Sequence, residues 1–377
     1  MNNKLIDFDD LPMAEPIGYH GRIMAEKDTE AIFCDDVPSF PIAYFTGPWL
    51  PMSYTDELSM YSGSLDYPLQ ILEQPARRNK IVDVMTKISN NGRSDFFTTP
   101  EIEISTLFDQ LQQIKSSGKP LYNQWVHKIN GKERNLSVPK SPLEKLLRDH
   151  IMDVIKLSPC HTGCHGGEEG WSVKRSLLQH IPLGSVLSFD LQQAFDRVDM
   201  QYVFDFYYRI FETRVKDEDA RRDVSGFLTH LSTVYKMGLA ASVLPQGSPI
   251  SVPLFNRLLY SVDELFEERA KKKNLRYTRW VDDFILSARE KDRRFDKVAG
   301  ALRIVNEDFY IAPNKVFWQQ NLPVYYLLNH KIVGNLVIPV TREEAKNRGE
   351  PIDASLFLPD RLTGFDDWID DEDLDNF

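Results

Sequence analysis

The sequence is poor in cysteine and contains no long apolar run. Three cysteines (Cys34, Cys160 and Cys164) in 377 residues are too few for a disulfide framework and indicate a reducing, cytoplasmic setting. No stretch approaches the ~18 apolar residues of a membrane span, so we expect no membrane partner. The first fifteen residues are acidic and lack an apolar segment, which argues against a secretory signal peptide.

Acidic residues outnumber basic ones, but their excess lies at the two ends of the chain. The formal net charge is −11. Residues 1–36 hold 3 basic and 9 acidic side chains, a charge of −6, and residues 359–377 hold 1 basic and 8 acidic, a charge of −7. The 41 basic and 39 acidic residues between them sum to +2. A nearly neutral centre can still present a basic groove, so the net charge does not exclude a nucleic-acid partner.

Hydrophobic periodicity predicts an α+β chain whose antiparallel sheet is backed by helices. The Pro-rich, acidic residues 1–60 are expected to be irregular. The Asn130-Gly131 turn predicts a β-hairpin over 125–139, and a capping box from Ser141 to Glu144 predicts a helix that ends by Pro159. Further strands are expected at 184–190, 276–288 (a strand–turn–strand) and 316–338, and further helices within 69–116 and at about 199–212, 218–236, 249–272 and 290–309.

Three segments carry the residue types of a catalytic site. Phe189–Asp196 (FDLQQAFD) places a carboxylate after a buried strand and an aromatic ring five residues later. Leu244–Pro249 (LPQGSP) is a tight turn that opens a helix, and Trp280–Phe284 (WVDDF) puts two aspartates at the tip of a hairpin. Each segment alone is ordinary turn or cap chemistry. Together, two apolar strands that end in uncompensated carboxylates are costly unless a cation lies between them.

The order and spacing of these segments resemble motifs A, B and C in the palm of reverse transcriptases. Upstream, residues 132–139 (KERNLSVP) and 171–176 (WSVKRS) are similar to the two fingers motifs. Downstream, residues 313–315 (PNK) resemble motif D, and residues 325–328 (YYLL) match the primer-grip hairpin loosely. The resemblance covers roughly residues 120–335.

The resemblance implies a right-hand polymerase with fingers and an antiparallel palm sheet. An N-terminal extension would occupy residues 1–118, the fingers 119–183 and the palm 184–335. Residues 336–377 would form a short acidic tail in place of a full thumb.

A two-metal site is also implied by the resemblance. Asp190 and Asp282 would hold two Mg²⁺ ions, for which Mn²⁺ can substitute, and Asp283 would support them. The backbone carbonyl of Leu191 would complete the metal shell. Lys315 would protonate the leaving pyrophosphate.

The same resemblance assigns nucleotide-binding roles. Phe195 would lie under the sugar and exclude a 2′-hydroxyl, which favours deoxynucleotides. Gln246 and Gly247 would line the nucleotide and template side, where glycine allows a close approach. Basic side chains of the two fingers motifs would clamp phosphate oxygens: Arg134, Arg175 and, as an alternate, Lys174. The competing interpretations are core packing for the phenylalanine and solvated surface charge for the basic residues.

The segment Cys160–His165 (CHTGCH) contains residue types that bind zinc. Zinc sites usually take a second Cys/His pair from elsewhere in the chain, and this sequence has none. Four ligands from six consecutive residues would also be strained. A zinc site is therefore not predicted from Cys160, His161, Cys164 and His165.

Resemblance to this family predicts an RNA-directed DNA polymerase that joins deoxynucleoside triphosphates into DNA. The chain shows no sign of a ribonuclease H, integrase, protease, maturase or endonuclease domain. The most similar class is therefore expected to be compact bacterial enzymes related to abortive infection, which implies antiviral defence and a noncoding RNA partner. Template-independent or protein-templated DNA synthesis on the same fold, or a non-catalytic assembly subunit, are the alternatives. The complete set of three aspartates argues against the last.

Two further expectations concern the ends of the chain. Without a basic thumb the duplex would be held weakly, which predicts an oligomer with itself or with a second polymerase subunit. In the N-terminal extension, Glu26 and Arg22 offer hydrogen-bonding groups that can imitate part of a base edge. They are candidates for a template supplied by the protein, and solvated surface is the alternative.

Overall fold

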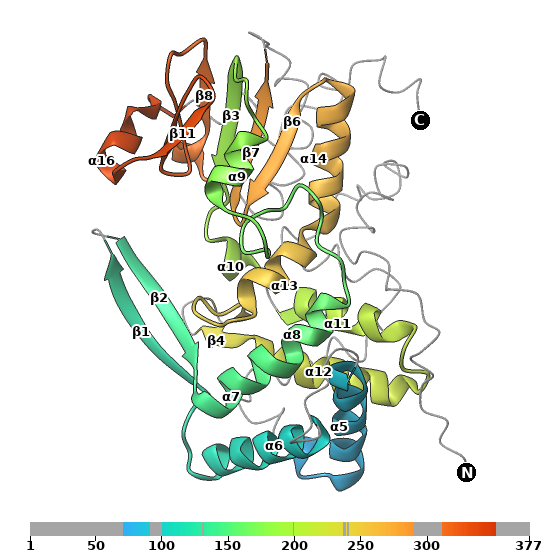
Figure 1. Ribbon diagram of the computed structural model, residues 1–377. Helices are drawn as coiled ribbons and strands as arrows, with labels where there is room; N and C mark the ends of the chain where they lie inside the picture. The colour runs from blue at the N-terminus through green and yellow to red at the C-terminus, as the bar shows by residue number, and fades with distance from the viewer. Residues whose placement is uncertain are drawn as a thin grey trace, which may run out of the picture. The chain divides into compact units, whose positions relative to one another are not determined.

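The computed structural model describes residues 71–90, 100–129, 132–198, 200–236, 239, 241–289 and 311–351. The expected irregular segment 1–60, the Asn130-Gly131 turn and the expected helix 290–309 lie outside these ranges. The chain divides into two compact units (Figure 1). Within the described ranges, the first unit comprises residues up to 160 and 195–260, and the second comprises 161–194 and 261–351. None of the described helices is long and apolar enough to cross a membrane.

The first unit is mainly helical and carries two small β-hairpins. Its helices are α5 (Pro75–Asn90), α6 (Pro100–Ser116), α7 (Ser141–Leu146), the π-turn η2 (Leu147–Ile151), α8 (Met152–Lys156), α10 (Ala194–Arg197), α11 (Met200–Glu212), α12 (Glu218–Ser232) and α13 (Ser251–Leu258). The hairpins pair β1 (Tyr122–Ile129) with β2 (Lys132–Pro139), and β4 (Val234–Lys236) with β5 (Ala241–Val243). The β1–β2 pairing confirms the expected hairpin. The core of the first unit is rich in aromatic side chains. Phe108, for example, contacts Phe227 edge-on, with ring centroids 5.1 Å apart.

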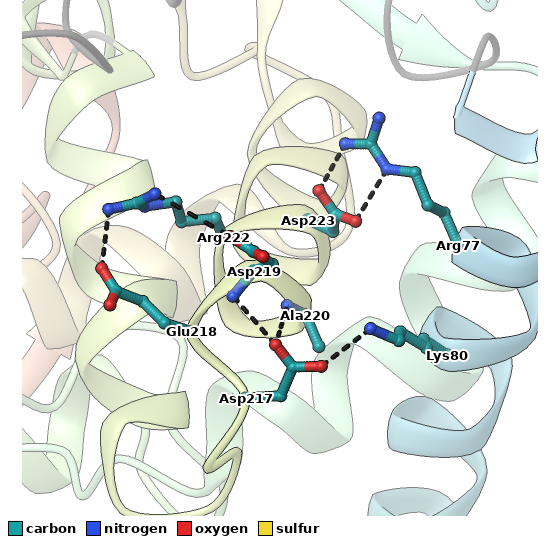
Figure 2. A network of polar contacts seen from close by, with 8 residues as sticks. All are labelled: Arg77, Lys80, Asp217, Glu218, Asp219, Ala220, Arg222 and Asp223. Carbon is teal, nitrogen blue, oxygen red and sulfur yellow. Dashed lines mark hydrogen bonds and ion pairs between the residues drawn. The ribbon is translucent and has the colours of Figure 1, made fainter. Parts of the chain in front are cut away.

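A network of ion pairs joins α5 to α12 and fixes where α12 begins (Figure 2). Arg77 pairs with both carboxylate oxygens of Asp223, and Lys80 lies 2.7 Å from Asp217. Asp217 is the N-cap of α12, and its side chain accepts hydrogen bonds from the backbone N–H groups of Asp219 and Ala220. This cap satisfies donors that the first turn of a helix leaves free.

Three expected helices differ from the structure. The helix that starts near residue 141 is capped by Lys140 without a side-chain hydrogen bond, so the predicted capping box is wrong, and the helix is interrupted by η2. The helix expected to reach 236 ends at Ser232, because Thr233 is extended and β4 pairs with β5. The helix expected over 249–272 is divided at Leu259, whose φ of −89° and ψ of 10° break the helical ladder between α13 and α14 (Tyr260–Lys272).

The second unit contains the antiparallel sheet that the sequence predicts. Its strand order is β6 (Arg276–Trp280), β7 (Asp283–Ala288), β3 (Ser185–Asp190) and β8 (Phe317–Gln320), and every pairing is antiparallel. A second antiparallel sheet is formed by β9 (Tyr325–Leu327), β10 (His330–Val333) and β11 (Leu336–Pro339). The β10–β11 hairpin crosses the domain boundary expected at residue 335. The remaining helices are α9 (Val173–Leu178), α14, α16 (Arg342–Ala345) and the 3₁₀ turns η4 (Pro313–Lys315) and η5 (Lys346–Arg348).

The two faces of the four-stranded sheet pack against different partners. On one face, Phe189 stacks on Phe284, and both rings contact Phe266 of α14. On the other face, Val186 and Ile285 pack against Leu177 of α9 and against side chains of the second sheet. Side chains alternate between faces along a strand, so Asp190 and Asp283 lie on this second face, at the end of β3 and the start of β7.

Candidate active site

The carboxylates of motifs A and C lie opposite each other in the sheet of the second unit. Asp190 is the register partner of Asp283, and residues opposed in this way have Cβ atoms about 4.5–5.5 Å apart. The backbone N–H of Leu191 donates to the carbonyl of Asp282 (3.1 Å), and the N–H of Ala312 donates to the carbonyl of Asp190 (2.9 Å). These bonds fix the end of β3 against the hairpin tip, so the structure brings the three predicted aspartates together.

Negative charge is concentrated at this place. One oxygen of Asp190, Oδ1, is buried and has no hydrogen-bond partner among the residues that the structure describes. Its other oxygen forms an ion pair with the ammonium group of Lys315. Burial, and after it the charges of Asp282 and Asp190, raises the pKa of Asp283 well above its ordinary value. The negative charges of these aspartates therefore oppose one another, and a bound cation would relieve that repulsion.

Such a donor set fits a divalent cation with oxygen ligands. A buried carboxylate oxygen without a donor is costly, and a bound cation would satisfy it. No group of three or more described carboxylate, imidazole or thiol side chains forms a ready-made metal cage. Mg²⁺, however, is commonly held by one or two carboxylates together with substrate phosphates, so an incomplete protein shell matches this ion.

The tip of the β6–β7 hairpin has a strained backbone. Trp280 pairs with Asp283, so Val281 and Asp282 form a two-residue loop. Val281 has a φ of +58°, which is rare for a β-branched residue. In two-residue hairpin loops with positive φ at the first position, glycine is the usual choice. The carbonyl of Val281 is held by Nη1 of Arg279 at 2.6 Å, which fixes the loop beside the aspartates.

A buried ion pair supports this loop from the opposite face of the sheet. Arg279 and Asp263 are both fully buried, and two guanidinium nitrogens, Nε and Nη2, each donate to an oxygen of Asp263 at 2.7 Å. The hydroxyl of Tyr277 donates to the same carboxylate. Our sequence analysis missed these residues. The detectable signal was a charged residue at a core-facing position of both α14 and β6.

The Cys160–His165 segment extends the edge of the sheet. Cys164 forms a parallel bridge with Arg279, whose N–H donates to the Gly163 carbonyl (2.8 Å) and whose carbonyl accepts from the N–H of His165 (2.9 Å). The His165 ring stacks on Trp171, with centroids 3.5 Å apart. Backbone pairing and ring stacking hold this segment in place, so it supports the β6–β7 hairpin.

Gly166 brings the same segment directly against the hairpin tip. A Cβ atom placed on Gly166 would lie 2.4 Å from the Val281 nitrogen, 2.7 Å from Val281 Cγ2 and 2.8 Å from the Trp280 carbonyl carbon. Real Cβ atoms essentially never approach other atoms so closely. The position therefore requires glycine because of space. A glycine after a Cys/His run gave no such signal in the sequence.

The predicted nucleotide-binding residues are divided between the units. Phe195, Gln246, Gly247 and Arg134 belong to the first. The Phe195 ring is partly buried against Phe255, with centroids 5.2 Å apart, and Arg134 is exposed on β2. The carbonyl of Gln246 accepts a hydrogen bond from the N–H of Ser137 (2.7 Å). Gly247 has a φ of +111°, and a Cβ there would lie 3.0 Å from Val138 Cγ2. The glycine is thus required where the turn meets β2.

Lys174 and Arg175 lie in the second unit, at the start of α9. Lys174 is exposed. Nη1 of Arg175 donates to the Gly170 carbonyl at 2.6 Å, and its guanidinium lies 4.5 Å from the centroid of the Trp171 ring. The arginine is therefore held in one orientation. Glu26 and Arg22, the candidate template residues, lie outside the described residues.

Comparison with curated proteins finds two bacterial relatives. The chain is 26% identical over 179 residues to the retron Mx162 reverse transcriptase of Myxococcus xanthus, which covers 44% of this chain and 35% of that protein. It is 29% identical over 139 residues to the retron Ec86 reverse transcriptase of Escherichia coli, which covers 37% of this chain and 38% of that protein. The chain thus matches little more than a third of the length of these relatives. The expected resemblance to bacterial reverse transcriptases is confirmed.

Solved structures with a related arrangement include two telomerases. The telomerase of Candida albicans, in complex with a fragment of telomeric RNA, gives a TM-score of 0.42 at 13% identity and covers 63% of this chain and 48% of that one. The apo telomerase of Candida tropicalis, truncated from its C-terminal domain, gives 0.38 at 13% identity and covers 56% and 53%. Likeness at this level carries no argument about function.

The family model for reverse transcriptase (RNA-dependent DNA polymerase) matches residues 126–327, more than half of the 377 residues. The match begins in β1 and ends in β9, so it includes motif A at the end of β3, the motif B turn before α13 and the aspartates at the β6–β7 tip. These are the segments on which the resemblance was based. The chain belongs to the reverse transcriptase family.

Proposed function

We propose that the chain is an RNA-directed DNA polymerase that adds deoxynucleotides to the 3′ end of a DNA strand. The observation that carries the proposal is the opposition of Asp190 and Asp283 in a family-matched sheet, with one buried Asp190 oxygen that has no partner in the described part of the chain. A bare cluster of carboxylates is unfavourable unless a cation and its substrate complete it. Nucleotidyl transfer supplies both.

Asp190, Asp282 and Asp283, with the carbonyl of Leu191, would hold two Mg²⁺ ions, or Mn²⁺ in their place. When bound, such ions activate the attacking hydroxyl and neutralise the charge of the triphosphate. Residues of the chain position the groups that take part. The hydrogen bond between Leu191 and Asp282 keeps motifs A and C in register. Lys315 forms an ion pair with Asp190 and is the group that would give a proton to the leaving pyrophosphate.

The roles proposed in substrate selection are those that the family resemblance implies. Phe195 would exclude the 2′-hydroxyl, and Gln246 and Gly247 would line the template side. Arg175 is the better supported phosphate clamp, because its guanidinium is oriented by Gly170 and Trp171 while only Nη1 has an acceptor among the described residues. Basic side chains with free donors suit phosphate oxygens. Exposed Lys174 and Arg134 would add positive charge.

The biological role that we propose is based on the two curated relatives. Both curated relatives are retron reverse transcriptases of bacteria, which favours a bacterial cytoplasmic enzyme that acts in antiviral defence with a noncoding RNA. A short thumb, an oligomeric or two-subunit assembly, and the expected division into extension, fingers and palm belong to the same proposal. DNA synthesis without a nucleic-acid template is the competing activity.

Primer extension tests this function. Purified protein is given Mg²⁺, deoxynucleotides and an RNA template with a DNA primer, before and after ribonuclease treatment. Asp190→Asn and Asp282→Asn should abolish incorporation, while Asp219→Asn, whose side chain is 87% exposed, should not. Wild-type protein that folds but never incorporates deoxynucleotides would refute the polymerase assignment. Incorporation that survives removal of all RNA would favour the untemplated activity.

A further inference from the structure

Arg348 is a basic residue beside the site to which none of the matched motifs assigns a role. It ends η5, and the chain then turns at Gly349, whose φ is +91°. The guanidinium carbon of Arg348 lies 3.5 Å from the centroid of the Phe317 ring. The side chain is partly buried. A cation stacked so closely on an aromatic ring is held in place by both dispersion and the ring's negative face.

Strand register places this stack on the catalytic face of the sheet. Phe317 of β8 is the partner of Ser188 in β3, so their side chains lie on the same face. Asp190 follows Ser188 by two residues and therefore shares that face, together with its partner Asp283. Neighbours two residues apart on one strand are roughly 7 Å apart. Arg348 therefore stacks on the residue pair Phe317–Ser188, which is next to the pair Asp190–Asp283 along this face of the sheet.

Electrostatics agree with this position. Burial lowers the pKa of Arg348, while the charges of Asp283 and Asp190 act on it in the opposite direction. The position of the guanidinium itself rests on its stacking on Phe317 and on the strand register.

The donors of Arg348 have no acceptor among the described residues. Three neighbouring lysines do have one: Lys315 pairs with Asp190, Lys331 with Glu344 and Lys346 with Glu343. Burial removes water from a guanidinium, which is unfavourable unless an acceptor replaces that water. Its five N–H groups form a rigid fork that fits phosphate oxygens. Stacking on Phe317 occupies a face of the guanidinium and leaves these in-plane donors available.

We propose that Arg348 is a phosphate-binding residue of the active site, and that Phe317 is the platform that orients it. Its ligand is a phosphate that sits at the aspartates during the reaction. Two phosphates meet this description: those of the incoming deoxynucleoside triphosphate and the last phosphodiester of the primer. The inference rests on the proposed function for the identity of these ligands, but the anion site itself does not require turnover.

The proposal is tested with substitutions of Arg348 and Phe317. Arg348→Gln removes both the positive charge and the fork of guanidinium N–H donors, and Arg348→Lys keeps the charge without the fork. Phe317→Leu removes the platform and leaves Arg348 in place. Arg342→Gln, an exposed arginine on neighbouring α16, is the matched control for charge in this segment. Melting temperatures identify any variant that does not fold. The conservative Arg348→Lys then keeps the test valid if Arg348→Gln fails to fold.

Binding is measured on the full chain in two arms. One arm titrates a deoxynucleoside triphosphate whose α,β-bridge cannot be cleaved, with Mg²⁺, and the other titrates a primer–template without nucleotide. Arg348→Gln should weaken one of them by about 10- to 100-fold, the usual loss for a hydrogen-bonded charge pair, with Arg348→Lys and Phe317→Leu intermediate and Arg342→Gln unchanged. The arm that responds identifies the phosphate.

Folded Arg348 variants that bind both ligands as tightly as wild type would overturn the proposal. An equal loss in Arg342→Gln would overturn it too, because general charge would then explain the effect. These outcomes are distinct from failure of the proposed function. A wild-type chain that binds both ligands but never extends a primer would refute the polymerase assignment and leave the Arg348 site measurable.

Discussion

Gly166→Ala is expected to displace the β6–β7 hairpin that carries the proposed catalytic aspartates, although the substitution adds only one methyl group. The added methyl would lie 2.4 Å from the Val281 nitrogen, although ordinary van der Waals contacts are 3.4–4 Å. About 1 Å of movement is therefore required. Gly166 has no left-handed φ, so the substitution is not strained by backbone conformation. The whole effect comes from the space between this residue and the hairpin tip.

The tip cannot yield without moving the aspartates. It is fixed by the Leu191–Asp282 hydrogen bond and by the bond from Arg279 to the Val281 carbonyl. Overpacking of this kind typically costs about 1–3 kcal/mol of stability. A displacement of about 1 Å at reacting groups can lower the rate by about 100-fold. We therefore expect a modest loss of stability and a much larger loss of kcat.

Gly163→Ala is the matched control in the same segment. Its Cβ would meet the Tyr277 ring at 3.1 Å and the His161 ring at 3.2 Å, so only side chains need to adjust. Denaturant unfolding and primer-extension kinetics are measured on both variants. Gly163→Ala should lose less activity for each kcal/mol of stability lost. If Gly166→Ala matches wild type in rate and lies within about 0.5 kcal/mol in stability, the contact does not constrain the site.

Three further predictions concern the core, the pH dependence and substrate choice. Asp263→Ala should cost about 3–5 kcal/mol in denaturant unfolding, because it leaves the buried Arg279 charge without its partner; a loss below 1 kcal/mol would contradict the pairing. Burial lowers the pKa of His180 from 6.5 to about 3, so the unfolded chain takes up a proton first as pH falls, and stability should drop by about 2 kcal/mol between pH 7 and pH 5 from this group alone. His180→Gln, measured in parallel, should show a shallower decline, and equal slopes would refute the assignment. Phe195→Val should let ribonucleotides compete with deoxynucleotides in a direct competition assay, and unchanged selectivity would return Phe195 to core packing against Phe255.

The candidate catalytic carboxylates could be identified in the sequence because their chemistry and strand pattern coincide. Asp190 ends an apolar strand, and the adjacent aspartates stand at the tip of a hairpin, where the pairing of β3 with β7 sets Asp283 opposite Asp190. The family resemblance rests on the same residues. Helix ends were less predictable. Val234 and Tyr235 continue an apolar pattern that suits a helix, but they prefer a strand once β5 is available as a partner.

Residues could not be predicted where their role depends on the lack of a side chain or on a partner far away in the sequence. The role of Gly166 depends on which backbone approaches it, and that partner lies more than a hundred residues along the chain. Gly247 was expected to make room for a nucleotide, whereas in the structure it also makes room for β2. Arg348 stands beside the aspartates because β8 pairs with β3. Sequence spacing contains no record of that register.

The unusual features of the β6–β7 hairpin, the positive φ of Val281 and the buried charge of Arg279, have one effect in common. A β-branched residue with positive φ costs about 1–3 kcal/mol and persists only where its surroundings enforce it. Arg279 supplies that enforcement, since the guanidinium that holds the Val281 carbonyl is itself locked by Asp263. Each feature alone breaks a local rule: a charge at a core position of a strand, and a valine where glycine is usual. Rules broken together at one place mark a functional site, and here they hold the Asp282 and Asp283 pair at a fixed position opposite Asp190.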